Sequence, residues 1–129
     1  METPTLTMKT VAVIGASNNR RKFGNIAVRA FQKAGYKVIP ITPAAAEVEG
    51  LRAYGSVLDV PETIDLATFY VPPAIGEEVI EQLAQKGIRE VWLNPGAGSS
   101  VIVSRARALG IRPVEGCSII RIGFSPNQF

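Results

Sequence analysis

Small and polar residues follow the first apolar run of the chain, and their types suit the binding of a phosphate group. Gly15, Ala16 and Ser17 come directly after the apolar residues 11–14, and a basic run occupies residues 20–22. Small residues let the backbone approach a phosphate closely, and hydroxyl and basic side chains hydrogen-bond to it. The plain alternative is a strand-to-helix turn with a solvated loop. Because the turn, the charge and the helix that follows agree, we predict an anion site here.

A helix that would complete this site begins near Gly24. Apolar residues within 24–34 recur at spacings of three and four, which predicts an amphipathic helix. Its first turn, at Gly24 and Asn25, would present free N–H groups and the positive end of the helix dipole to an anion. Three consecutive basic residues would add charge beside this turn: Arg20, Arg21 and Lys22.

The pattern differs from that of a nicotinamide dinucleotide site. Such a site has the spacing G-x-G-x-x-G and an acidic residue at the end of the second strand, which binds the ribose hydroxyl. Here Ile41, Thr42 and Pro43 occupy that strand end, and the next acidic residue is Glu47. An adenine nucleotide that lacks this contact, or that carries an extra phosphate, fits better. An NAD(H)-binding sensor or oxidoreductase module is the alternative.

Missing residue types exclude several kinds of catalysis. The chain has no histidine and one cysteine. This excludes Ser-His-Asp and Cys-His catalysis, histidine metal sites, a phosphohistidine and a thiolate zinc cluster. Beyond Glu77 and Glu78, which we expect at the solvated start of a helix, the eleven acidic residues form no cluster. We therefore expect no metal site and no catalytic residues, and a binding module more than an enzyme.

Three similar segments predict how helices and strands alternate. Residues 34–41, 86–93 and 109–116 each contain a glycine, an apolar residue, a basic residue and then a valine. This order is typical of a helix that ends at a C′ glycine and leads into a buried parallel strand. We expect helices over 24–34, 73–86 and 99–109, strands over 10–15, 36–41, 66–71, 90–93 and 111–114, and a weaker strand and helical turn near 50–58.

The alternation predicts an α/β chain, with a three-layer Rossmann-like fold and a mostly parallel sheet of five or six strands. The 129 residues and 47% apolar content suit one domain over residues 9–129, after a flexible tail over residues 1–8. The sequence has no membrane-length apolar run, no signal-like start and, at net charge +3, no basic stripe. We therefore expect a cytoplasmic protein that binds neither membrane nor nucleic acid.

The fold class also predicts where a ligand would lie. In an open parallel sheet, ligands bind beyond the carboxyl ends of the strands. Small, polar, proline and glycine residues follow each predicted strand at that edge. They add these candidates to the turn and the basic run: Ile41, Thr42, Pro43, Val71, Pro72, Pro73, Asn94, Pro95 and Gly96.

Four stretches together resemble the CoA-binding domain family: "VAVIGAS", "KVIPITP", "YGSVLDVPETIDLATFYVPP" and "VWLNPGAGS". The similarity is greatest to its stand-alone members and extends to the CoA-binding domain of the succinyl-CoA synthetase α subunit. The resemblance implies a Rossmann-like fold that binds CoA or acyl-CoA. It implies that residues 15–17 hold phosphate and that residues 41–43 flank the adenosine. Residues 71–73 would shape the groove, and residues 94–96 would lie near the pantetheine.

The resemblance also bears on activity. The synthetase uses a phosphorylated histidine from a second domain, and this chain has no histidine. A complete ligase is therefore excluded, and we expect a CoA-binding protein that is not catalytic alone. The alternative is a CoA-binding subunit of an NDP-forming acyl-CoA synthetase. From charge alone, the basic run 20–22 would meet the 3′-phosphate or the pyrophosphate.

Two features near the end of the chain have two interpretations each. Cys117 is either a small buried hydrophobe or a thiol near the CoA sulfur that could form a mixed disulfide. Residues 118–129 are apolar enough to pack onto the domain or onto a second copy, which leaves a homodimer open. As a test of the phosphate turn, we expect Gly15→Val to block the ligand and to leave the fold mostly intact.

Overall fold

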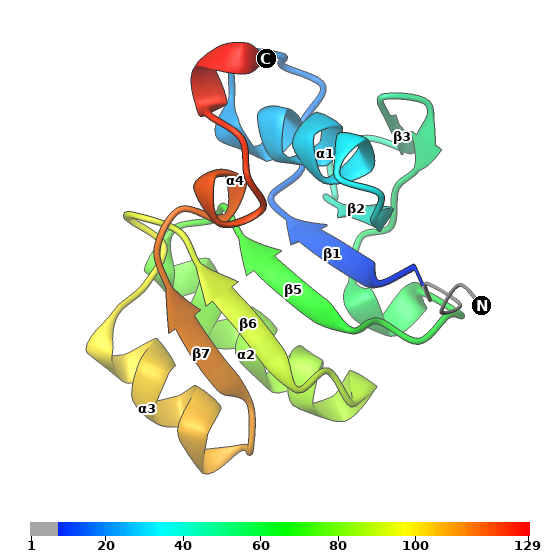
Figure 1. Cartoon of the computed structure of the whole chain (residues 1–129). Coiled ribbons are helices and arrows are strands. Elements are labelled where there is room, and N and C mark those ends of the chain that lie inside the picture. The colour runs from blue at the N-terminus through cyan, green and yellow to red at the C-terminus, as the bar shows by residue number, and fades with distance from the viewer. Residues whose placement is uncertain (1–7) are drawn as a thin grey trace, which may run out of the picture.

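A five-stranded parallel sheet forms the centre of the computed structural model, which describes residues 8–129 (Figure 1). The strand order is β2-β1-β5-β6-β7, so the order reverses between β1 and β5. Open α/β sheets bind their ligands at such a switch point. The α/β class and the five-stranded form of the sheet are thus confirmed. The strands are β1 (Thr10–Ile14), β2 (Lys37–Ile41), β5 (Leu66–Phe69), β6 (Glu90–Leu93) and β7 (Arg112–Glu115).

Helices cover both faces of this sheet (Figure 1). Helix α1 (Phe23–Lys33) lies on one face, and α2 (Pro73–Lys86) and α3 (Ser100–Ala108) lie on the other. Glycines with positive φ follow all three helices, as the repeated segments predict. The short α4 (Ser118–Arg121) and the 3₁₀ turns η1 (Val57–Asp59) and η2 (Pro126–Gln128) complete the elements.

The central strand β1 shows how the layers are held together. All five of its residues are buried. Val11 and Val13 belong to the cluster around Phe31 of α1, whereas Ala12 and Ile14 belong to the cluster formed with α2 and α3. Because successive side chains of a strand point to opposite faces, one apolar run supports both layers.

The weaker element predicted near residues 50–58 forms a separate hairpin and the turn η1. Strands β3 (Glu47–Val48) and β4 (Leu51–Arg52) pair antiparallel and join no strand of the main sheet. Glu49 and Gly50 both have positive φ, 51° and 77°, which is the conformation of a tight two-residue hairpin turn.

Tyr54, just after β4, forms an isolated parallel bridge with Ile41 at the end of β2. Its N–H donates to the Pro40 carbonyl at 3.0 Å, and its carbonyl accepts from the Thr42 N–H at 2.8 Å. Within the described residues, the segment thus adds this single bridge to the main sheet and no full sixth strand.

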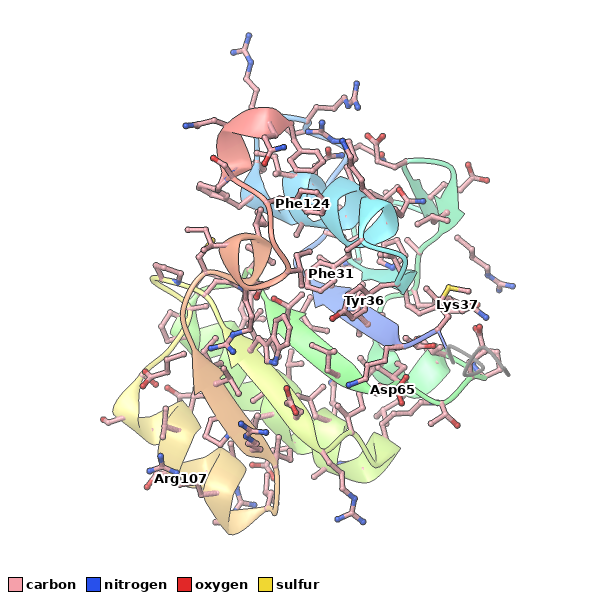
Figure 2. All side chains as sticks on the ribbon, in the orientation of Figure 1. Phe31, Tyr36, Lys37, Asp65, Arg107 and Phe124 are labelled. Atoms are coloured by element: carbon pink, nitrogen blue, oxygen red, sulfur yellow. The ribbon has the colours of Figure 1, made fainter. Side chains whose placement is uncertain are left out.

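The C-terminal segment packs onto its own domain, one of its two predicted destinations. Ile119 is fully buried against α1, and Phe124 and Phe129 pack beside it with their ring centroids 5.6 Å apart. Figure 2 shows Phe124 over α1, with Phe31 between that helix and the sheet. Apart from Met8, the predicted tail lies outside the described residues. Within residues 8–129, no helix is long and apolar enough to cross a membrane.

Candidate functional site

A cleft of about 710 Å³ opens at the carboxyl ends of the strands, over the switch point. The loops after β1, β2, β5 and β6 line it. No aspartate or glutamate of the described chain is among its lining residues. The cleft brings together twelve of the sequence-based candidates: Gly15, Ala16, Ser17, Arg21, Lys22, Thr42, Val71, Pro72, Pro73, Asn94, Pro95 and Gly96.

Five other candidates lie outside the lining of the cleft: Arg20, Asn25, Ile41, Pro43 and Cys117. Ile41 is buried at the end of β2, and Pro43 is exposed just beyond it. Cys117 is half-buried before α4, in a separate shallow depression shared with Ile120 and Arg121. A covalent role for this thiol stays a prediction, and the geometry adds nothing in its favour.

The turn after β1 is built around the end of β2. The backbone N–H groups of Gly15 and Ala16 donate to the carbonyl of Ile41, at 3.0 and 3.2 Å. These two donors hold the strands together, so the small residues offer a ligand close approach and no N–H group. Among the cleft-lining residues of this turn, the free donor is the N–H of Ser17, which has no acceptor within residues 8–129.

Gly15 is a glycine because the end of β5 lies directly against it. Its φ is 92°, and a Cβ atom there would lie 2.5 Å from the carbonyl oxygen of Tyr70. That atom belongs to the backbone and cannot rotate away. The expectation that Gly15→Val leaves the fold mostly intact is therefore wrong, because a side chain at this position would push β1 and β5 apart.

Gly24 brings the start of α1 against the same turn. A Cβ atom on Gly24 would lie 2.0 Å from the carbonyl oxygen of Gly15. The N–H groups of Phe23 and Gly24 have no acceptor among the described residues, and both residues line the cleft. The N–H of Asn25 donates to the carbonyl of Lys22. The N–H groups that α1 offers an anion are thus those of Phe23 and Gly24, one residue earlier than expected.

The three basic residues of the loop divide into two groups. Arg21 and Lys22 are exposed and line the cleft. Arg20 pairs with Glu49 of the hairpin turn, its Nε 3.3 Å from the carboxylate Oε2. Among the described residues, two cations and no carboxylate therefore line the cleft, which makes it electropositive.

Asn25 is fully buried and serves the loop. Its Nδ2 donates to the carbonyl of Ser17 at 2.8 Å and to Glu49 at 2.9 Å. Its Oδ1 accepts from Nε of Arg29 at 2.7 Å. All its polar atoms have protein partners, so its side chain has nothing left for a ligand.

Asn94 lies at the floor of the cleft, and its side chain is also fully engaged. It is 5% exposed. Its Nδ2 donates to Oγ1 of Thr68 and to the carbonyl of Phe69, both at 2.8 Å, and its Oδ1 accepts from the N–H of Ser118 at 2.8 Å. Asn94 therefore ties β5, β6 and α4 together.

Tyr70 and Phe23 are cleft residues that the sequence-based candidates omit. The Tyr70 hydroxyl is buried without a hydrogen-bond partner in the described chain. Burial raises the pKa of Tyr70 to about 12, although the nearby Thr68 and Ser118 hydroxyls pull it down. Phe23, the first residue of α1, is 56% exposed at the cleft. Its signal in the sequence is an aromatic residue directly before the glycine that begins the helix.

Comparison with known proteins connects this chain to a domain family. Residues 9–123 match the family model described as CoA binding domain. The alpha subunit of ADP-forming acetate–CoA ligase I from Pyrococcus furiosus is 31% identical over 134 residues, which cover 92% of this chain and 29% of that subunit. An ADP-forming acetate–CoA ligase from Methanocaldococcus jannaschii is 38% identical over 81 residues, or 63% of this chain and 12% of the ligase. The chain thus spans less than a third of each ligase relative.

Solved structures agree with this relationship. A conserved hypothetical protein from Pyrococcus furiosus superposes with a TM-score of 0.81 at 32% identity, over 89% of this chain and 99% of that one. The dinucleotide-forming acetyl-coenzyme A synthetase 1 of Ca. Korarchaeum cryptofilum superposes with a TM-score of 0.73 at 31% identity, over 81% of this chain and 25% of the synthetase. The fold therefore occurs both as a short chain and as one part of a large enzyme.

Proposed function

The chain belongs to the CoA-binding domain family, and we propose that it binds CoA or an acyl-CoA in the cleft over the switch point. One observation carries the proposal: the cleft combines unpaired N–H groups with the cations Arg21 and Lys22 and has no carboxylate in its described lining. Phosphate groups satisfy such donors, and a positive site without acids attracts a ligand that carries several of them.

The polarity of the cleft suggests how the ligand is oriented. The phosphates would lie near Ser17, Phe23 and Gly24, where the N–H donors and the dipole of α1 are directed. The exposed ring of Phe23 is suited to stack on the adenine, which has an aromatic face. The apolar pantetheine would follow the loops after β5 and β6, past Val71 and Ala97.

In this proposal the chain is not catalytic by itself. Among the described lining residues, the ionisable side chains are Arg21, Lys22 and Tyr70. The first two are cations at neutral pH, and the Tyr70 hydroxyl is a buried neutral group. None of them is suited to accept a proton near pH 7, so recognition is the role that the cleft supports best.

A second candidate role is to present CoA to a larger partner. The match to the alpha subunit of an ADP-forming acetate–CoA ligase favours it. Co-purification with a nucleotide-binding synthetase subunit would support this role. An NAD(H) module is disfavoured because no acidic side chain lies among the described lining residues beyond β2. The homodimer stays a prediction that light scattering can test.

Calorimetric titration of the purified chain tests the proposal. We expect CoA and acetyl-CoA to bind, dephospho-CoA to bind more weakly, and NAD⁺ and ADP to give little heat. A preference for NAD⁺ over CoA would contradict the proposal, and so would the absence of any CoA binding. Equal binding of CoA and dephospho-CoA would leave CoA as the ligand, but it would mean that the basic loop does not contact the 3′-phosphate.

A further inference from the structure

Glu49 occupies an unusual position beside the loop that faces the ligand. It is the one non-glycine residue within residues 8–129 that has a positive φ, a conformation that side chains other than those of Asn and Asp rarely adopt. Its side chain is 22% exposed, and its carboxylate is directed toward the loop after β1. A strained residue that the surrounding structure holds in place suggests a functional constraint.

The Glu49 carboxylate fixes this loop through two partners. Its Oε2 accepts from Nδ2 of Asn25 at 2.9 Å and lies 3.3 Å from Nε of Arg20. The same Asn25 Nδ2 donates to the carbonyl of Ser17, so one buried amide joins the hairpin turn to the start of the loop. Glu49 therefore acts on the loop at both Ser17 and Arg20.

Helix α1 and the rest of the hairpin strengthen this arrangement. Arg29 donates through Nε to Oδ1 of Asn25 and through Nη2 to the carbonyl of Arg20, at 2.7 and 2.9 Å. Nδ2 of Asn18 donates to the backbone carbonyl of Glu47 at 2.8 Å. The loop is thus held from two sides, and Glu49 supplies the one carboxylate among these contacts.

The charge distribution follows from the same contacts. Arg20 is paired and lies outside the cleft lining, whereas Arg21 and Lys22 belong to it. We propose that Glu49 is a positioning residue with two effects: it fixes the loop over residues 17–22, so that Arg21 and Lys22 meet the ligand phosphates, and it keeps Arg20 paired outside the cleft with its positive charge neutralised. The ligand half of this inference, which is the effect of Glu49 on ligand binding, rests on the proposed function. The loop half, which is the ordering of residues 17–22 by Glu49, does not.

Hydrogen exchange of the ligand-free chain tests the loop half. Glu49→Ala removes both contacts, and we expect the amides of Asn19, Arg21 and Lys22 to exchange about fivefold faster or more, because their acceptors lie within the loop. Glu47→Ala is the matched control, since the Asn18 contact uses its backbone carbonyl. Unchanged exchange in Glu49→Ala, or equal acceleration in both variants, would overturn the positioning role.

Calorimetry with CoA tests the ligand half. Glu49→Gln keeps an oxygen that can accept from Asn25 but removes the negative charge that neutralises Arg20. We expect the CoA dissociation constant to fall about threefold to tenfold at low ionic strength, and by less at high salt, because the cleft gains positive charge. This gain in CoA affinity should disappear in the double variant Glu49→Gln/Arg20→Gln and be absent in Glu47→Gln.

The outcomes separate the two proposals. A CoA affinity in Glu49→Gln that equals that of Glu47→Gln would overturn the charge role of Glu49 while leaving CoA binding intact. If the parent chain binds no CoA, the proposed function fails, and the exchange experiment still decides whether Glu49 positions the loop.

Discussion

The loop after β1 and the loop after β6 both bring polar residues to the cleft, but their hydrogen bonds are used differently. At the first loop, Ser17 and the first two residues of α1, Phe23 and Gly24, have N–H groups without an acceptor among the described residues, and two cations are exposed. In the second, the Asn94 side chain makes three internal hydrogen bonds. A polar residue at a strand end is therefore a ligand candidate only if the fold leaves its donors and acceptors free.

The largest expected effect is a difference in stability between substitutions at two glycines, one at the start of α1 against the first loop and one in the second loop. Gly24→Ala should lower the free energy of unfolding by about 3 kcal/mol, because its Cβ would meet the Gly15 carbonyl at 2.0 Å. Gly98→Ala, after β6, is the matched control, since its Cβ would come no closer than 3.4 Å to Leu93, and we expect a change within about 1 kcal/mol. Urea denaturation measures both. Equal losses would mean that the two loops are packed alike.

The next effect tests whether Asn94 is structural. Asn94→Ala should cost about 2–3 kcal/mol of unfolding free energy, because it leaves the buried Ser118 N–H without its acceptor. We expect the CoA affinity of the folded variant to change less than about threefold, since the side chain has no free polar group. Asn18→Ala, which removes one exposed contact in the β1 loop, is the control. A large loss of CoA affinity with unchanged stability would mean that Asn94 contacts the ligand.

The basic side chains should show the opposite behaviour. Arg21→Ala/Lys22→Ala should weaken CoA binding about 30-fold and change the unfolding free energy by less than about 0.5 kcal/mol. Both side chains are exposed at the cleft, which is why the fold tolerates their loss. Arg89→Ala/Arg107→Ala removes the same charge from exposed positions outside the cleft. If both double variants weaken CoA binding equally, the overall electrostatic field of the protein would be responsible, and not direct contacts in the cleft.

The smallest effect concerns the unpaired hydroxyl between the two loops. Tyr70→Phe should leave the free energy of unfolding at pH 7 unchanged or raise it by up to about 1 kcal/mol, because it removes a buried hydroxyl that has no partner among the described residues.

The same variant should alter the alkaline limb of the stability profile. The folded chain holds the Tyr70 proton up to a pKa of about 12, against 10.0 for the ordinary group. The folded state thus binds more protons between these values, and its stability falls as the pH rises through them. Tyr70→Phe should lose less stability between pH 10 and pH 12. An identical alkaline limb would mean that the hydroxyl titrates normally.

Local signals explain why so much of the fold is predictable. Helix α2 is found over the predicted residues, because Pro73 suits its first position and Gly87 ends it in the left-handed conformation. The strands follow from short apolar runs after such glycines. The β3–β4 hairpin is only partly predictable, since its strands have two residues each and Glu49 adopts a φ that glutamate rarely shows.

The candidate site is predictable at the level of loops and less so at the level of atoms. The sequence shows that Asn94 follows a strand, but its partners Thr68 and Ser118 are 26 and 24 residues away. In the same way, Asn25 is bound to Glu49, 24 residues later. Whether a polar side chain is free for a ligand depends on such distant partners, which periodicity and spacing do not report.

The position of the cleft over the switch point also has a consequence for folding kinetics. Its walls come from the first, middle and later parts of the chain, and the Thr10–Asp65 hydrogen bond that joins the start of β1 to β5 closes a separation of 55 residues. No local fragment contains the site, so it forms only when these distant parts have docked. A ligand that binds there recognises only the assembled sheet. It would therefore lower the unfolding rate more than it raises the folding rate.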